Sequence, residues 1–417
     1  MQPIGLFAWR FTNIAPTIAP RFSRQTAAMY KIRTYNTISI KGLDRFGRED
    51  YEVASELPSP DAFLIRSQKL HDMEFPTTLK AIGRAGAGVN NVPLERCSEE
   101  GIVVFNAPGA NANAVKELVL AGMLLGSRDI NAGMQFVGSL SPQGGLDPLL
   151  EKEKKRFAGS EVVGKTLGVV GLGNIGSLVA NMGLALGMKV IGYDPAISVE
   201  AAWRLSSDVE KMDNLPTLFG RADYISLHLP ALDSTRGLIN EALLNNAQPG
   251  TVLLNFARGE IVDVPAILAA LDSGRLHRYV CDFPTNATLG HEKVLQMPHI
   301  GASTGEAEEN CAVMVADQLM DFLENGNVRN SVNFPNIELP RTTPVRLTIT
   351  NKNVPRVLNS ITGIIADHDI NIVDMLNKSR DEVAYTIIDL AVCPDEKSLQ
   401  ALRALDEVIN LRVIGCD

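Results

Sequence analysis

One stretch of this chain constrains its fold most strongly, because residues 165–194 have the pattern of a strand, a glycine turn, a helix and a second strand. The apolar, β-branched run 166–170 is followed by Gly171-Leu-Gly173-Asn-Ile-Gly176, where a helix should open. Gly171 allows a tight turn, Gly173 lets the backbone approach a pyrophosphate, and Gly176 lets the helix pack close to the strand. The stretch therefore predicts a dinucleotide site.

The end of the second strand indicates which dinucleotide would bind. Asp194 follows this strand, roughly 20 residues beyond the last glycine. A carboxylate there can accept hydrogen bonds from both ribose hydroxyls of NAD and would repel the 2′-phosphate of NADP. The free N–H groups where the helix opens, at Asn174 and Ile175, would hold the pyrophosphate. A GxGxxG sequence alone is weak evidence, but strand, helix, second strand and terminal acid are all in place, and we predict an NAD site.

Composition sets limits on the rest of the molecule. A chain of 417 residues with 45% hydrophobic and 21% charged residues predicts two to three folded domains. The net charge of −9 disfavours nucleic-acid binding, and the sequence lacks an apolar run long enough for a membrane span. Five scattered cysteines without a metal-ligand spacing predict reduced thiols and no metal site, and we expect Cys281 to be a small buried hydrophobe.

The first 28 residues contain three arginines and no acidic residue, which is typical of an organellar presequence. Their three prolines would break an amphipathic helix, so we favour a start codon assigned upstream of Met29. We expect a cytoplasmic protein, or an organellar one if residues 1–28 are a genuine presequence.

Residues 29–113 predict a small α/β domain that binds substrate, with strands near 32–40, 62–65, 81–83 and 103–106. Three polar or glycine-rich turns follow three of these strands. In open α/β sheets ligands bind beyond the carboxyl ends of the strands, so these turns can line one side of a cleft. The candidate substrate residues in them are Arg66, Ser67, Ala87, Gly88 and Asn106.

Strands and helices continue to alternate after Asp194, which predicts a doubly wound parallel sheet of the Rossmann type over 114–304. One later strand ends at His228-Leu229-Pro230, the next is followed by Arg258, and a third ends near Asp282. His299 follows Pro298 in the next segment. Residues 305–335 should complete the first domain. After a linker rich in Asn and Pro, 341–417 has the order βαββαβ of a ferredoxin-like module.

Five motifs in this order resemble the D-isomer-specific 2-hydroxyacid dehydrogenase family, in its D-3-phosphoglycerate dehydrogenase branch: RAGAGVNNV, GIVVFNAPGANANAVKE, GKTLGVVGLGNIG, NFARGEIVD and PHIGAST. The last module resembles an ACT regulatory domain through Asn351-Lys-Asn353-Val-Pro355 and INI at 370–372. The resemblance implies a Rossmann domain inserted into a flavodoxin-like substrate domain, followed by the ACT domain.

The resemblance also implies roles for single residues. Hydride transfer from a 2-hydroxy acid needs a base for the hydroxyl proton and a cation for the carboxylate. His299 resembles the family acid/base and Arg258 the carboxylate-binding arginine, while Asp282 resembles the acid near the nicotinamide carboxamide. The predicted cofactor positions are Gly171, Gly173, Asn174, Ile175, Gly176, Asp194, His228, Leu229, Pro230, Ala257, Asp282 and Gly301, and the candidate effector positions are Asn351, Asn353 and Asn371.

Three features depart from the family pattern, one of them Lys116, where a small residue is commoner. Family enzymes usually carry a glutamate that pairs with the histidine, but Asn286 and Ala287 stand there in this chain. We therefore hypothesise that His299 works without a charged partner. Arg356 stands where ACT domains usually have glycine, which puts effector binding in doubt.

The resemblance implies NAD-dependent oxidation of 3-phosphoglycerate to 3-phosphohydroxypyruvate in L-serine biosynthesis, by a homo-oligomer with L-serine as a candidate effector. Two alternatives stay open. The same chemistry could act on another 2-hydroxy acid, such as 2-hydroxyglutarate, glycerate or lactate, or the chain could be a non-catalytic NAD sensor.

Overall fold

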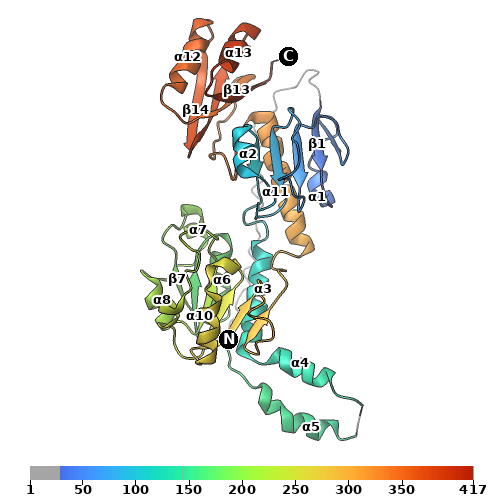
Figure 1. Cartoon of the computed structure of the whole chain (residues 1–417), viewed down its shortest axis with the longest axis vertical. Helices are drawn as coiled ribbons and strands as arrows, with labels where there is room; N and C mark the ends of the chain where they lie inside the picture. The colour runs from blue at the N-terminus through green and yellow to red at the C-terminus, as the bar shows by residue number, and fades with distance from the viewer. Residues whose placement is uncertain (1–28, 143, 417) are drawn as a thin grey trace, which may run out of the picture.

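The computed structural model describes residues 29–142 and 144–416, which contain three β-sheets with helices packed around them (Figure 1). The predictions made for residues 1–28 lie outside the described residues. The predicted α/β fold class is confirmed by two parallel sheets and a small antiparallel sheet. None of the described helices is both long and apolar enough to span a bilayer.

The first sheet is parallel and has the order β2-β1-β3-β4-β5, as in flavodoxin-like folds. The predicted strand 32–40 is too long, because the chain turns at Asn36 and helix α1 starts at Ile40. One strand, β2, was not predicted from the sequence. The strands are β1 (Tyr30–Thr34), β2 (Tyr51–Ala54), β3 (Ala62–Ile65), β4 (Ala81–Arg84) and β5 (Val103–Phe105), with helices α1 (Ile40–Leu43) and α2 (Leu94–Glu99) between them.

A long helix from much later in the chain, α11 (Gly305–Asn325), covers one face of this sheet. Its apolar side packs so closely on β4 that a Cβ at Gly83 would overlap Val315. The acidic first turn of α11 suits the positive end of its helix dipole, and Thr304 caps it by accepting a hydrogen bond from the Ala307 amide. The first sheet is therefore built from residues that precede the nucleotide-binding region and covered by a helix that follows it in sequence.

The second sheet is parallel and has the order β12-β11-β10-β9-β6-β7-β8, so its strand order reverses between β6 and β9. Buried apolar clusters on its two faces confirm the predicted doubly wound arrangement. A ligand crevice is expected at the carboxyl ends of β6 and β9. The strands are β6 (Thr166–Val170), β7 (Lys189–Tyr193), β8 (Glu210–Lys211), β9 (Tyr224–Leu227), β10 (Thr251–Asn255), β11 (Leu276–Cys281) and β12 (Val294–Gln296).

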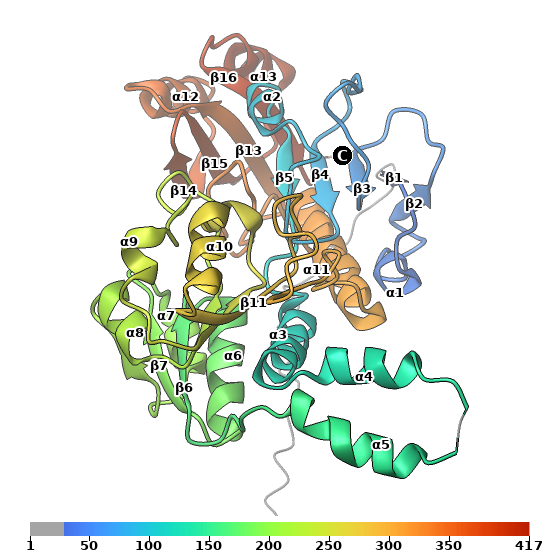
Figure 2. The same ribbon diagram turned by 60° about the horizontal axis from the view of Figure 1, so that its bottom comes forward.

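The helices around this sheet are α3 (Ala112–Ser127), α6 (Asn174–Ala185), α7 (Val199–Arg204), α8 (Leu215–Arg221), α9 (Glu241–Leu244) and α10 (Val264–Asp272). Two further helices, α4 (Ile130–Gly138) and α5 (Leu146–Glu153), form an arm that extends away from both parallel sheets (Figures 1 and 2). Neither helix of the arm has a buried residue, and Met134 and Val137 are 70% and 55% exposed.

The C-terminal unit has an antiparallel sheet in the order β14-β15-β13-β16, which confirms the predicted ferredoxin-like βαββαβ module. Arg356, at the turn before its first helix, has a left-handed backbone with φ of 76°. A side chain strains that conformation, whereas the glycine expected there would not. The elements are β13 (Val345–Lys352), α12 (Val357–Asp367), β14 (Ile372–Arg380), β15 (Val383–Leu390), α13 (Glu396–Arg403) and β16 (Val408–Ile414).

The prediction that all thiols are reduced is wrong for two of the five cysteines. Cys393 and Cys416 form a disulfide with their Cα atoms 5.8 Å apart, while Cys97, Cys281 and Cys311 are free and buried. Because β15 and β16 both run antiparallel to β13, their carboxyl ends lie at the same edge of the sheet. That arrangement brings together two cysteines that lie 23 residues apart in sequence.

Candidate active site

The glycine turn after β6 has the backbone geometry predicted for it. Gly171 has φ of 90°, and its Cα faces the carbonyl of His228, which a Cβ would approach to 2.5 Å. A Cβ at Gly176 would collide with the Gly171 carbonyl, whereas the space beside Gly173 is open to 4 Å. The open side of Gly173 at the amino end of α6 can therefore receive a pyrophosphate.

Asp194 is fixed at the end of β7 next to this turn. Its Oδ2 accepts a hydrogen bond from the Leu172 amide at 2.8 Å, and its Oδ1 accepts one from the Ala196 amide at 2.9 Å. Each carboxylate oxygen has a further lone pair, so ribose hydroxyls can still donate to it. The glycine turn and the acidic residue thus form one rigid unit that fits a dinucleotide without a 2′-phosphate.

His228, at the end of β9, lies behind this turn. Its Nε2 is 2.8 Å from Oγ of Ser226, and its buried Nδ1 has no partner among the described residues. Burial lowers the pKa of His228 to about 3. The ring is therefore neutral at physiological pH.

The loop that carries His299 is held by Asp282. This carboxylate is 2% exposed and accepts hydrogen bonds from the Ile300 amide at 2.8 Å and the Gly301 amide at 2.7 Å. His299 itself has a left-handed backbone with φ of 57°, an unusual conformation for a residue with a side chain. Its ring packs against the Phe283 ring with centroids 4.8 Å apart. Asp282 thus anchors the loop that carries His299.

Arg258 also lies near Phe283. Its guanidinium carbon is 6.0 Å from the centre of that ring, and Nη1 donates to the Ala257 carbonyl at 2.7 Å. Asn255 supports the turn by donating to the Arg258 carbonyl at 2.9 Å. A Cβ at Gly88 would lie 3.6 Å from Nη2 of Arg258, so the turn after β4 meets this arginine. The structure therefore brings Gly88, from a turn of the first sheet, close to Arg258 and His299, from turns of the second.

The predicted substrate turns are held to one another by hydrogen bonds. Asn36 accepts from the Ser67 amide at 2.9 Å, which shapes the turn after β3. Asn106 donates to the Ala87 carbonyl at 2.6 Å, which ties the turn after β5 to the turn after β4. The sheet order places these turns side by side, since β3, β4 and β5 are neighbours.

One residue of the cleft was missed as a site residue in the sequence. Arg84 ends β4 and folds back over its own turn, where a Cβ at Gly86 would overlap the guanidinium. Burial lowers the pKa of Arg84, and the positive charges of Arg66 and Arg258 lower it further. Its buried Nε has no partner among the described residues. The signal was present in the sequence, because Arg84 directly precedes a glycine turn at the carboxyl end of a strand.

Three guanidinium groups thus share this region, and one carboxylate from α11 reaches them. Nη2 of Arg66 forms an ion pair with Glu308, and both side chains are about two-fifths exposed, at 40% and 41%. The Arg84 and Arg258 guanidinium groups have no ion pair in the part of the chain that the structure describes. Such a concentration of positive charge can bind a ligand with more than one anionic group.

The position of the usual family glutamate does not supply a partner for His299. Asn286 is exposed in a turn held by Thr285 and Thr288, with the two hydroxyl oxygens 3.1 Å apart. Across residues 29–142 and 144–416, no carboxylate lies within ion-pairing distance of the His299 ring.

The three candidate effector asparagines do not come together in one chain. Asn351 is 2% exposed and pairs with Ala384 at the start of β15, while the carbonyl of Asn371 accepts from Ala391 just past the end of β15. Asn353 donates to the Asp381 carbonyl at 3.0 Å, near Asn351. Since β15 has eight residues, Asn371 lies about 25 Å from the other two at the usual rise per residue.

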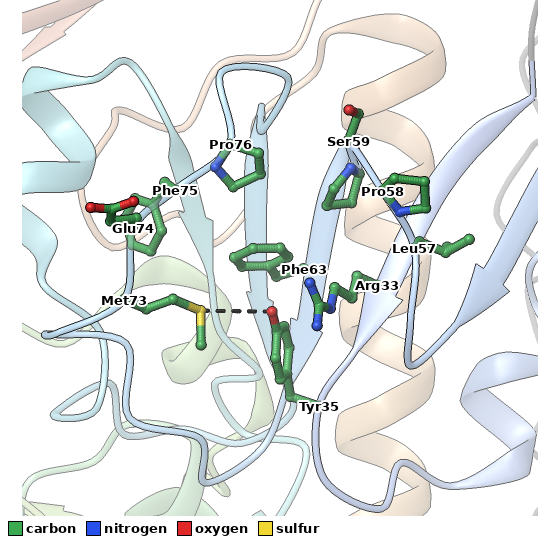
Figure 3. A pocket seen from close by; sticks show the side chains of 11 residues that line it. Arg33, Tyr35, Leu57, Pro58, Ser59, Phe63, Met73, Glu74, Phe75 and Pro76 are labelled. Atoms are coloured by element: carbon green, nitrogen blue, oxygen red, sulfur yellow. Dashed lines mark hydrogen bonds between the residues drawn. The ribbon is translucent and has the colours of Figure 1, made fainter.

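A separate hollow of about 530 Å³ opens beside β1 and β3, away from this cleft (Figure 3). Aromatic and proline side chains line it, and the Tyr35 hydroxyl donates to Sδ of Met73 at 3.6 Å. None of the predicted catalytic or cofactor residues reaches it. We place the candidate active site by the converging charged and polar groups, and not by the size of this hollow.

Comparison with known proteins identifies the family of this chain. Residues 120–302 match the family model "D-isomer specific 2-hydroxyacid dehydrogenase, NAD binding domain". The chain is 33% identical to a D-3-phosphoglycerate dehydrogenase of Escherichia coli over 350 residues, which cover 81% of this chain and 82% of that protein. It is 35% identical to one of Methanocaldococcus jannaschii over 337 residues, which cover 78% of this chain but 61% of the relative.

Among solved structures, NAD-bound 3-phosphoglycerate dehydrogenase from Entamoeba histolytica is similar, with a TM-score of 0.57 and 27% identity over 73% of this chain and 99% of that one. D-mandelate dehydrogenase from Rhodotorula graminis has a TM-score of 0.62 at 23% identity, over 75% of this chain and all of that one, and shares the fold.

Proposed function

Because this chain belongs to the D-isomer specific 2-hydroxyacid dehydrogenase family, we propose that it oxidises 3-phosphoglycerate to 3-phosphohydroxypyruvate with NAD, in L-serine biosynthesis. The observation that carries the proposal is the cluster of Arg66, Arg84 and Arg258 next to His299. A 2-hydroxy acid with a phosphate has two anionic ends, and the cluster offers cations for both. The similar proteins from Methanocaldococcus jannaschii and Escherichia coli, both D-3-phosphoglycerate dehydrogenases, support the same substrate.

Each proposed residue has a separate role in substrate binding or proton transfer. Arg258 holds the substrate carboxylate with its planar fork of donors, helped by backbone N–H groups at Ala87 and Gly88. The His299 imidazole takes the proton of the C2 hydroxyl as the C2 hydride leaves. Bound NAD would accept that hydride at its nicotinamide ring. Arg258 also stabilises negative charge that develops on the C2 oxygen.

The phosphate end is assigned to the other two arginines. Arg66 and Arg84 end neighbouring strands, and the buried, unpartnered Nε of Arg84 is a donor in need of an acceptor. A phosphate oxygen would supply that acceptor. Ser67 and Asn106 shape the turns around it and keep the arginines in place.

The test is the rate of NADH oxidation with 3-phosphohydroxypyruvate, hydroxypyruvate, 2-oxoglutarate and pyruvate, in wild type and in the Arg84→Gln variant. We expect the wild type to prefer the phosphorylated keto acid. The variant should raise KM for that substrate roughly 10- to 100-fold, the scale of a lost charge-assisted hydrogen bond, and leave KM for hydroxypyruvate nearly unchanged. The Arg33→Gln variant is the matched control, because Arg33 lies in the same domain and pairs with the exposed Glu56.

Preference for another keto acid would keep the fold and the chemistry but refute the phosphorylated substrate. A second candidate function, a non-catalytic NAD sensor, is favoured because no carboxylate among the described residues pairs with His299. That reading requires NADH binding without turnover of any of the four keto acids, and measurable turnover would refute it.

We further infer that the protein is a homo-oligomer and that the α4–α5 arm is its contact surface. Neither described helix of the arm has a buried residue, and α4 carries the exposed apolar side chains of Met134 and Val137. The Val137→Glu variant should dissociate the assembly in analytical ultracentrifugation if the arm is the interface.

L-serine binding at Asn351, Asn353 and Asn371 would need a second copy of the chain, because the structure separates Asn371 from the other two. The cytoplasm stays the predicted location.

A further inference from the structure

The ion pair between Arg66 and Glu308 places a negative charge inside a site that is proposed to bind anions. Glu308 lies in the first turns of α11, and the guanidinium it contacts is in the turn after β3. Both side chains are about two-fifths exposed, at 40% and 41%, so the pair is accessible to a ligand from solvent. A pair this exposed contributes little to stability, and a more highly charged anion can replace one partner at small cost.

The charges in the site indicate why a bound substrate would separate Glu308 from Arg66. Arg66, Arg84 and Arg258 supply three positive charges, and Glu308 removes one of them. A phosphorylated 2-hydroxy acid carries about three negative charges at neutral pH, one on its carboxylate and roughly two on its phosphate. The substrate alone therefore balances the three arginines, and Glu308 is in excess once the substrate is bound.

We propose that Glu308 is an internal counter-ion for Arg66, which the substrate phosphate displaces, and that it thereby sets the affinity for phosphorylated substrates. This inference rests on the proposed function. Without ligand, Glu308 reduces the repulsion among three nearby guanidinium groups. With ligand, it repels the phosphate, so that it weakens binding of the phosphorylated end and leaves the carboxylate end unaffected.

The alternative role for Glu308 is positional, since a carboxylate can also hold an arginine in its working conformation. Two variants separate the roles. Glu308→Gln removes the charge but keeps an oxygen that can accept from Arg66, whereas Glu308→Ala removes both. A counter-ion predicts tighter phosphate binding in both variants, while a positioning residue predicts weaker binding in the alanine variant.

The first measurement is calorimetric binding of inorganic phosphate to the full-length protein, which needs no turnover. We expect Glu308→Gln to lower Kd about three- to fivefold, the scale of one exposed ion pair. The control is Glu309→Gln on the same helix, because Glu309 pairs with Lys41 at 2.5 Å on the outer side. This control should leave Kd unchanged. An unchanged or higher Kd in Glu308→Gln would overturn the proposal.

The second measurement is KM for 3-phosphohydroxypyruvate and for hydroxypyruvate in the same variants. We expect Glu308→Gln to lower KM for the phosphorylated substrate by the same factor and to leave KM for hydroxypyruvate unchanged. Equal changes for both substrates would overturn the proposal. If the wild type does not prefer the phosphorylated substrate, the proposed function fails, and the phosphate calorimetry still decides the role of Glu308.

Discussion

The attachment of the C-terminal unit depends on a fully buried ion pair between Arg346 and Asp389. Both side chains are 0% exposed. Arg346 donates through Nε to Oδ1 of Asp389 at 2.6 Å and through Nη2 to Oδ2 at 2.9 Å. Its Nη1 donates to the carbonyls of Asn325 and Leu339 at 2.8 and 2.9 Å. Since Asn325 ends α11, this single side chain joins the β13–β15 sheet to the helix that covers the first sheet.

Replacing Asp389 with Ala leaves the guanidinium buried with two carbonyl acceptors and no counter-charge. Breaking such a pair from one side costs about 3–5 kcal/mol. Replacing both partners with apolar residues, as in Arg346→Met with Asp389→Leu, removes the charge problem and is expected to cost less than about 2 kcal/mol. The double variant also loses the hydrogen bonds that the Thr342 amide and hydroxyl donate to Oδ2 of Asp389, at 3.2 and 3.1 Å, and those that Arg346 donates to the Asn325 and Leu339 carbonyls.

Hydrogen exchange of the β13 and β15 amides is the suitable assay, because a chain with several domains need not unfold in one step. In the Asp389→Ala variant we expect exchange from these strands to accelerate more than a hundredfold, the factor that corresponds to about 3 kcal/mol. The double variant should recover most of the protection. Equal loss of protection in both variants would refute the reasoning, because the cost would then come from lost packing and not from an unpaired charge.

Three further predictions concern single positions. Asn286→Glu should shift the acid limb of the pH–rate profile to higher pH, because a carboxylate beside an imidazole favours its protonated form, and an unchanged limb would contradict this. In the folded protein, burial keeps His228 unprotonated down to about pH 3. In the unfolded chain the same histidine takes up a proton below about pH 6.5. Lowering the pH from 6.5 towards 3 therefore reduces the free energy of unfolding by up to about 1.4 kcal/mol per pH unit. His228→Asn should flatten this slope in urea unfolding between pH 6 and 4. Arg356→Gly should raise stability by about 1 kcal/mol, since it relieves a backbone φ of 76°, whereas Arg356→Ala should bring no gain in the same thermal unfolding experiment.

The parts of the fold that follow from local rules could be predicted from the sequence. The geometry of Gly171, Gly173 and Gly176 follows from what a chain must do between a strand and a helix, and alternating strands and helices determine the doubly wound sheet. The first strand was predicted too long because Ile38 and Ile40 continue its alternation, while the turn at Asn36 ends it.

Features that depend on tertiary neighbours could not be predicted in the same way. The Cys393–Cys416 disulfide needs the order of strands in the last sheet, which sequence spacing does not give. The separation of Asn371 from Asn351 has the same origin, since Asn351 pairs with Ala384 near the start of β15 while Asn371 contacts Ala391 just past its end. The Arg66–Glu308 pair joins residues 242 positions apart through the packing of α11.

The geometry around His299 explains how a histidine can keep its orientation without the family glutamate. Asp282 accepts hydrogen bonds from the amides of Ile300 and Gly301, the two residues after His299, and the Phe283 ring packs against the imidazole. These contacts hold the loop through its backbone and the ring through its face, so neither requires a charge on the imidazole. A glutamate would supply orientation and charge together. We therefore expect Asn286→Glu to change the pH dependence of the reaction, through the added charge, and to leave KM nearly unchanged.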